Sequence, residues 1–214
     1  MKVCIVGAGA IGGWIGAKFA RAGHTVTVLA RGAALAAIKE NGLQLIEGGE
    51  TQVAQVHAAA SATELDTPDL LVIAVKAPGL RDAAVSVASL IGPNTIVLTA
   101  MNGVPWWFFD RADRSLAGAQ LATIDATGEI AKSIPSRNVI GCVVHAACSV
   151  DAPAVIRHKM GARLIIGEPS GGSSPRLRLL HETLAAAGFE PESSEDIQRD
   201  VWFKLWGNMT MNPV

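Results

Sequence analysis

Residues 2–12 read KVCIVGAGAIG, a short apolar run that passes directly into a glycine-rich turn. Its three glycines match the spacing G-x-G-x-x-G, in which the first permits a tight turn and the second lets the backbone approach a pyrophosphate. The third lets the following helix pack closely on the strand. An ordinary glycine-rich turn is the alternative, but this one follows a predicted strand and opens a predicted helix. The stretch therefore predicts a dinucleotide-binding loop whose cofactor-binding residues are Gly7, Gly9, Ala10, Ile11 and Gly12.

The alternation of apolar runs and helical patterns continues beyond this loop. Strands are predicted at residues 25–29, 69–76 and 94–103, and a pair of strands within residues 43–58. Helical spacing follows the glycine turn and returns over residues 79–92. Continuous apolar strands separated by helices are typical of a parallel sheet that is covered on both faces. The predicted fold is therefore α/β, a Rossmann-type doubly wound sheet.

The pattern changes in the second half of the chain. Residues 121–135 have helical character, and three strands without intervening helices are predicted at residues 138–150, 154–159 and 163–169. Successive strands of this kind predict an antiparallel extension of the sheet.

A Pro-, Gly- and Ser-rich stretch at residues 169–176 has the clearest linker composition in the chain. After it come a predicted helix, a short strand and a terminal helix. We therefore expect a nucleotide-binding domain at residues 1–172. Residues 173–214 are expected to hold a connecting helix and strand and the first helix of a second domain.

Composition argues against several classes of function. Eighteen basic and 19 acidic residues give a net charge of −1, so neither nucleic acid nor a membrane surface is an expected partner. No apolar run is long enough to span a bilayer. Three cysteines without a C-x-x-C pair predict a reducing, cytoplasmic location. The absence of tyrosine excludes a tyrosine proton donor, and the five histidines lack metal-ligand spacing, so no metal is expected.

Polar residues follow three of the predicted strands. Arg31 comes after residues 25–29, where NAD-binding units usually carry an acidic residue for the ribose hydroxyls. A guanidinium there favours the 2′-phosphate of NADP(H), although a solvated surface arginine is the alternative. Lys76 and Asn102 end the next two strands, and ligands of open α/β sheets bind beyond such carboxyl ends. We therefore expect all three residues to face an NADPH or NADP cofactor.

The terminal helix, predicted over residues 196–212, carries one polar stripe on an otherwise apolar surface. A solvated face with an Asp200–Lys204 ion pair is one interpretation. A helix that is apolar nearly all round is typically buried, however, and buried amides and ammonium groups need a partner. A polar ligand is therefore favoured, with Lys204 as general acid and Asn208 and Asn212 as substrate-binding residues.

The motifs GAGAIG, VLAR, VIAVKA, MNGVP and WFKLWGNMTMNP together resemble the ketopantoate reductase (2-dehydropantoate 2-reductase) family. The match runs through the whole chain in order, and Trp106 and Trp107 after the Asn-Gly pair indicate a divergent branch. The resemblance implies NADPH-dependent reduction of a small 2-oxo acid, ketopantoate, to pantoate in pantothenate biosynthesis. It also implies that Lys204 is the catalytic general acid and that Asn102 lies beside both nicotinamide and substrate.

The resemblance further implies that an all-helical substrate domain follows the Rossmann domain and that the active site lies between the two. In this family the helical domain continues past the position of residue 214 and supplies a glutamate and a serine to the substrate. The chain is therefore expected to be a truncated fragment that holds only the start of that domain. Two alternatives stay open, a β-hydroxyacid dehydrogenase-like oxidoreductase and a non-catalytic NADP(H)-binding sensor. The oligomeric state is left open, and a homodimer is one option.

Overall fold

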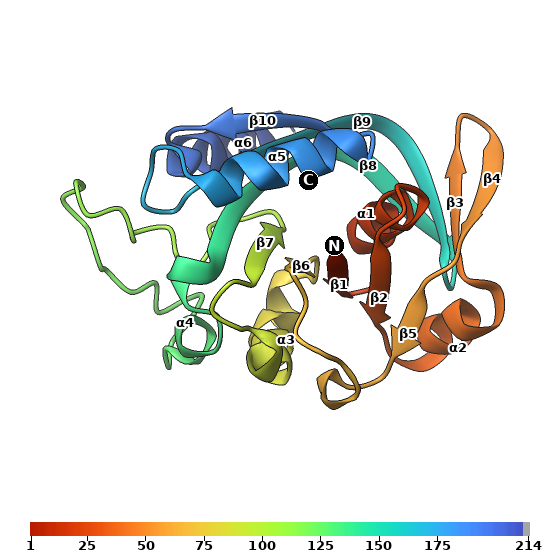
Figure 1. Cartoon of the computed structure of the whole chain (residues 1–214). Coiled ribbons are helices and arrows are strands. Elements are labelled where there is room, and N and C mark those ends of the chain that lie inside the picture. Colours follow the sequence, from red (N-terminus) through yellow and green to blue (C-terminus); the bar gives the residue numbers. More distant parts are fainter. Residues whose placement is uncertain (212–214) are drawn as a thin grey trace.

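The computed structural model describes residues 1–211, which form ten strands and six α-helices (Figure 1). The strands are β1 (Lys2–Val6), β2 (Thr25–Leu29), β3 (Leu43–Glu47), β4 (Glu50–Ala54), β5 (His57–Ala59), β6 (Leu70–Ile73), β7 (Ile96–Ala100), β8 (Val139–Ala152), β9 (Val155–Gly167) and β10 (Glu190–Ser194). The helices are α1 (Ala10–Arg21), α2 (Gly32–Asn41), α3 (Leu80–Val87), α4 (Glu129–Ser133), α5 (Pro175–Ala186) and α6 (Ile197–Met211).

All ten strands belong to one sheet. Its order is β4-β3-β9-β8-β7-β6-β1-β2-β5, and β10 pairs with β9. The strands from β5 to β8 run parallel, and Ile5 of β1 lies between Val28 of β2 and Val72 of β6. Strands β6 and β7 are buried along their whole length, which explains their continuous apolar sequences. The predicted doubly wound sheet is confirmed.

Two hydrophobic clusters cover the two faces of the sheet. One contains Trp14 and Phe19 of α1 together with Leu180 of α5. The other contains residues of α3, α4 and α6, with Trp106 and Trp107 packed among them. The sheet is therefore the middle of three layers, as expected for a doubly wound fold.

The antiparallel extension is confirmed, but it consists of two long strands and not of the three predicted at residues 138–150, 154–159 and 163–169. Strand β9 continues through Gly161, whose φ of +76° a glycine adopts without steric cost. Register shifts in its pairing with β8 absorb the irregularity that the sequence suggested was a break. Figure 1 shows both strands curving as far as the β3–β4 hairpin, where β3 pairs with β9.

The helix predicted over residues 121–135 is wrong for most of its length, because only α4 is helical there. The buried carboxylate of Asp125 accepts hydrogen bonds from the N–H groups of Ile130 and Ala131, and Gly128 has a left-handed conformation before α4 begins. Short polar side chains compete with the helix for backbone groups and therefore favour turns and caps.

The predicted linker at residues 169–176 is closed by an ion pair between the buried Glu168 and the partly exposed Arg176. Glu168 is only 5% exposed and accepts hydrogen bonds from Ser174 Oγ and, at 2.9 Å, from Arg176 Nε. Burial alone would raise the pKa of Glu168, but these hydrogen bonds and the charge of Arg176 outweigh it and hold the pKa below its ordinary value. Residues beyond the linker return to the sheet as β10, and the division into two domains near residue 172 stays a prediction.

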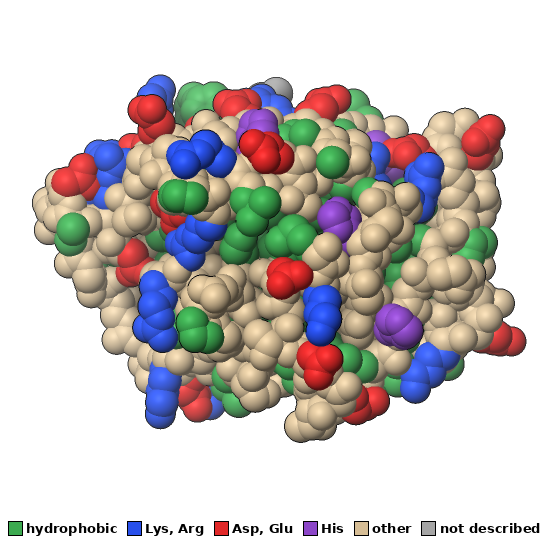
Figure 2. Space-filling model, viewed as in Figure 1, with side chains coloured by type: hydrophobic (Ala, Val, Ile, Leu, Met, Phe, Trp, Pro, Cys, Tyr) green, Lys and Arg blue, Asp and Glu red, His purple; other side chains and the backbone are tan. Residues whose placement is uncertain are grey.

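The described surface has two contrasting parts. On the face in Figure 2, acidic and basic side chains are interspersed, in keeping with the net charge of −1. Helix α6 instead exposes a set of large apolar side chains to between 59 and 72%, namely Trp202, Phe203, Trp206 and Met209. None of the described helices combines the length and the apolar character that a membrane crossing requires.

Replacing Arg176 with methionine leaves the Glu168 carboxylate buried without its cation. We expect Arg176→Met to lower the free energy of unfolding by roughly 3 kcal/mol near neutral pH, measured by urea denaturation. The folded-state pKa of Glu168 is lowered, so this loss is complete above the ordinary glutamate pKa of about 4.3 and disappears as the pH falls through the lower folded value.

Arg163→Met is the matched control, because the Arg163–Glu192 pair is about half exposed. It should cost less than about 1 kcal/mol. Equal losses in the two variants would show that burial adds nothing to the Glu168–Arg176 pair.

Candidate functional site

The glycine loop joins β1 to α1 in the geometry that a phosphate group requires. Gly7 has φ +105°, which turns the chain, and α1 begins at Ala10 without a side-chain cap. A Cβ added to Gly12 would lie 2.0 Å from the Gly7 carbonyl oxygen, so only glycine lets the helix lie this close to the turn. The N-terminal N–H groups of this 12-residue helix are therefore available to an anion beyond the loop.

Two cavities lie on either side of this loop. The first, of about 430 Å³, is lined by Gly7 and Leu29 and by residues of α3. The second, of about 420 Å³, is lined by Gly9, Ala100 and Val144. Val75 lines both cavities, so the two adjoin, and we refer to them together as the crevice. It follows the carboxyl ends of β1, β2, β6 and β7, where the strand order reverses between β1 and β6.

The structure places the predicted cofactor-binding residues along this crevice, except Gly12, which is buried in α1 and lines neither cavity. Arg31 lines the first cavity, whereas Lys76 and Asn102 line the second together with Ala10 and Ile11. The side chains of Arg31, Lys76 and Asn102 are exposed. Within the described part of the chain they form no hydrogen bond or ion pair, so their donors are free for a ligand.

A small cleft next to the second cavity brings together residues from distant parts of the chain. It is lined by Asn102, by Lys204 and Asn208 of α6, and by Cys142 and neighbouring apolar residues. Lys204 and Asn208 are half-buried. Asn102 therefore lies where the crevice meets the part of α6 that carries the polar stripe. Asn212, the last predicted substrate-binding residue, lies outside the described residues.

The ion pair between Asp200 and Lys204 that the sequence allows is not formed. Asp200 instead accepts a hydrogen bond from Ser194 Oγ at the end of β10. Among residues 1–211, Lys204 has no carboxylate within ion-pair distance. Lys204 therefore lines the cleft without a counter-ion from the described residues.

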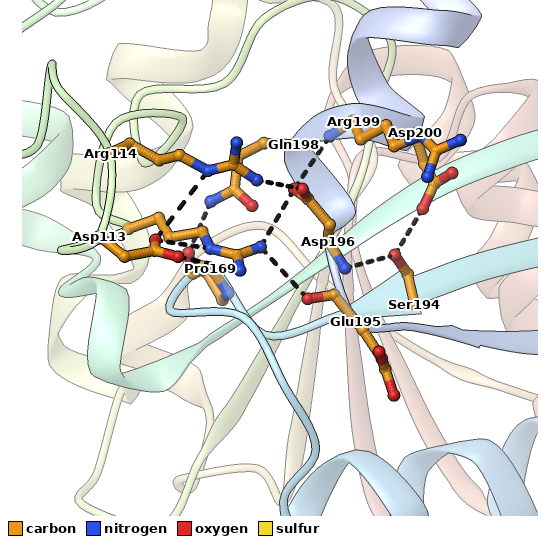
Figure 3. A network of polar contacts seen from close by, with 10 residues as sticks. Asp113, Arg114, Pro169, Ser194, Glu195, Asp196, Gln198, Arg199 and Asp200 are labelled. Carbon is orange, nitrogen blue, oxygen red and sulfur yellow. Dashed lines mark hydrogen bonds and ion pairs between the residues drawn. The ribbon is translucent and has the colours of Figure 1, made fainter.

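A polar network holds the first turn of α6 in place (Figure 3). Arg111 Nη1 lies 3.3 Å from Asp196 Oδ1, and Arg114 contacts the other carboxylate oxygen of Asp196. Gln198 donates a hydrogen bond to the backbone carbonyl of Pro169 at 2.5 Å. The long connection before α4 and the linker after β9 thus fix the helix that carries Lys204.

Several lining residues were not anticipated from the sequence. Ser61, Asp82 and Ser86 line the first cavity, and Cys142 lines the cleft. Asp82 lies in the first turn of α3, where acidic residues are common, so its position in the sequence offered no reason to place it in the same cavity as Arg31. Burial raises the pKa of Cys142 to about 12, so its thiol stays neutral and contributes apolar surface.

Comparison with known proteins points to the same family as the sequence motifs. The sequence model of the family described as ketopantoate reductase PanE/ApbA matches residues 3–171. The chain is 48% identical over 215 residues to a 2-dehydropantoate 2-reductase of Mesorhizobium japonicum, covering all of this chain and 66% of that protein. A 2-dehydropantoate 2-reductase of Aquifex aeolicus is 30% identical over 217 residues, covering all of this chain and 62% of that protein.

A crystal structure from Ralstonia solanacearum MolK2, provisionally assigned as a ketopantoate reductase, shares the fold. It is 54% identical, with a TM-score of 0.96 over 99% of this chain and 65% of that one. The chain thus spans slightly less than two thirds of the length of these relatives.

The contact between Gly12 and Gly7 predicts a strong difference between two glycines of the loop. In Gly12→Ala the new methyl group would meet a backbone carbonyl, so we expect the free energy of unfolding to fall by about 1–3 kcal/mol. In Gly9→Ala the methyl group meets no heavy atom within 4 Å, and stability should be unchanged. Thermal and urea denaturation of both variants would contradict this if Gly9→Ala were the more destabilised.

Proposed function

The chain belongs to the ketopantoate reductase PanE/ApbA family, and we propose that the protein reduces the 2-oxo acid ketopantoate to pantoate with NADPH. The observation that carries this proposal is the position of Asn102. It lines both the glycine-loop crevice and the cleft that holds Lys204 and Asn208. A nicotinamide in the crevice and a carbonyl compound bound beside Lys204 and Asn208 would therefore meet at this residue.

The residues of the crevice fit a dinucleotide. The space beside Gly9 is open, since an added Cβ would meet no atom within 4 Å, and it lies next to the N-terminus of α1 where a pyrophosphate is favoured. We assign Arg31 to the 2′-phosphate at one end of the crevice. Lys76 and Asn102 are assigned to the nicotinamide end.

The cleft residues have the chemistry that reduction of a carbonyl needs. When bound, NADPH supplies the hydride for the carbonyl carbon. The Lys204 ammonium donates a proton to the carbonyl oxygen, acting as general acid. Asn102 and Asn208 orient the substrate by hydrogen bonds, so that its carbonyl faces the nicotinamide end of the crevice. Asn212, outside the described residues, is proposed as a further substrate ligand.

The domain boundary, the cellular location and the oligomeric state are not tested by the structure and stay part of the proposal. Residues 1–172 would form the nucleotide-binding domain, and residues 173–214 would lead into the substrate domain. A cytoplasmic location stays a prediction that rests on the three free cysteines. A homodimer likewise stays a prediction.

Turnover is tested on the protein expressed from its full reading frame, by following NADPH oxidation with ketopantoate. We expect saturable turnover in the wild type. In Lys204→Met we expect kcat to fall by about 10²–10⁴-fold because the proton donor is lost. The affinity for NADPH should be unchanged, since Lys204 lines the cleft and not the crevice.

Lys159→Met is the control, because Lys159 is an exposed lysine of β9. It should retain full activity. Full activity in Lys204→Met would remove the general-acid role. A wild type that binds NADPH but turns over neither ketopantoate nor other 2-oxo acids would favour the sensor alternative.

Arg31 is predicted to set the preference for NADPH over NADH. Loss of a hydrogen-bonded charge typically costs about 1.5–3 kcal/mol, so Arg31→Ala should weaken NADPH binding by roughly 10- to 100-fold. NADH binding should change little, because NADH has no 2′-phosphate. Isothermal titration of both cofactors measures the effect, with Arg21→Ala at the end of α1 as control. Similar wild-type affinities for the two cofactors would contradict the assignment.

A further inference from the structure

Strand β8 separates the crevice from α6, and its alternate residues face opposite ways. Val144 and Ala146 line the cavity beside the glycine loop. Val143 belongs to the hydrophobic cluster that includes Val201 of α6. Because side chains alternate along a strand, His145 lies on the same face as Val143 and points toward α6. Val143 also lines the cleft that holds Lys204, and the half-buried His145 is the next residue on the same face of β8.

The backbone of His145 is fixed by a bulge in the β8–β9 ladder. The register shifts between His145 and Ala147, and Gly161 of β9 lies opposite the shift. A Cβ on Gly161 would come within 2.5 Å of the His145 carbonyl oxygen, so the two backbones are in close contact. Bulges commonly re-aim a side chain next to an active site. Here the bulge occurs at Ala146, which lines the crevice, next to His145.

Four charged side chains on three elements influence the pKa of His145. They are Lys204 and Asp200 of α6, Arg163 of β9 and Glu192 of β10. Two of the four are bound to one another, because Arg163 Nε donates to Glu192 Oε2 at 2.7 Å. Asp200 is engaged by Ser194 Oγ. Lys204 is therefore the charged neighbour of His145 for which the described residues provide no counter-ion.

The surroundings keep the imidazole neutral. Partial burial lowers the pKa of His145, and repulsion from Lys204 and Arg163 lowers the pKa further, against the smaller opposing effects of Glu192 and Asp200. A neutral imidazole has one ring nitrogen that accepts a hydrogen bond. It can therefore accept from an ammonium group that an imidazolium would repel.

No hydrogen bond joins His145 to Lys204 among the described residues, but both lie on the α6 side of β8. We propose that His145 is a positioning residue that accepts a hydrogen bond from the Lys204 ammonium and so orients it toward the cleft. The kinetic consequence rests on the proposed function, whereas the coupling between the two side chains does not. Protonation of His145 removes the acceptor and adds a like charge, so activity falls as the pH drops through the His145 pKa. By linkage, the charged Lys204 disfavours protonation of His145 by the same free energy by which a protonated His145 disfavours the charge on Lys204.

The coupling is tested without substrate by NMR titration of the histidine rings in the wild type and in Lys204→Met. We expect the pKa of His145 to rise in the variant, because one repelling charge is gone. His57, exposed on β5, is the internal control and should titrate identically in both proteins. An unchanged His145 titration would overturn the proposal. If the coupling is present but ketopantoate is not reduced, the positioning role stands and the assigned reaction fails.

The kinetic test compares His145→Leu with His145→Gln in the full-length enzyme. We expect kcat to fall about tenfold in His145→Leu, which loses the acceptor, and to be largely restored in His145→Gln, whose amide oxygen replaces it. The acid limb of the wild-type kcat profile should be absent in His145→Gln, since glutamine does not titrate. His57→Gln should keep the wild-type profile. Wild-type kcat in His145→Leu, or an unchanged acid limb in His145→Gln, would overturn the proposal.

Discussion

The close contact between Gly12 of α1 and the Gly7 carbonyl is the constraint on which the rest of the structure depends. It holds α1 directly on the turn, so the helix N-terminus opens toward the crevice. Two further glycines extend the same close packing along the helix, because a Cβ on Gly13 would lie 2.6 Å from Ile156, and one on Gly16 would lie 3.2 Å from Ile5. The helix can therefore pack on the parallel sheet and on the antiparallel extension at the same time.

The extension gives the two halves of the site a common wall. Strand β8 continues the parallel sheet beside β7 and then runs on with β9 beyond it. One of its faces completes the crevice through Val144 and Ala146, and the other supports α6 through Val143. The network around Asp196 fixes the start of α6 against the same framework. A side chain on β8 can consequently act on Lys204 without entering the crevice.

Local sequence patterns failed where tertiary contacts outweighed them. The spacing over residues 121–135 resembles a helix, but Asp125 binds backbone N–H groups in the first turn of α4, so the helix begins only at Glu129. The sequence around Gly161 predicted a break between two strands, but β9 pairs with β8 both before and after this glycine and so continues through it. The polar stripe of the last helix was recognised, yet the partner of Asp200 is Ser194 on another element. In each case the deciding group is a cap or a neighbouring strand that periodicity does not contain.

The sequence by itself determined the doubly wound sheet, the glycine loop, the family and the position of Arg31 after the second strand. These features depend on residues within a few positions of one another, where turn chemistry and apolar periodicity act directly. Only the tertiary structure decided that Asn102, Lys204 and Asn208 share one cleft and that His145 lies on the side of β8 that packs against α6. That convergence depends on strand register and on how α6 packs across β8, and both are set by contacts between segments far apart in the chain.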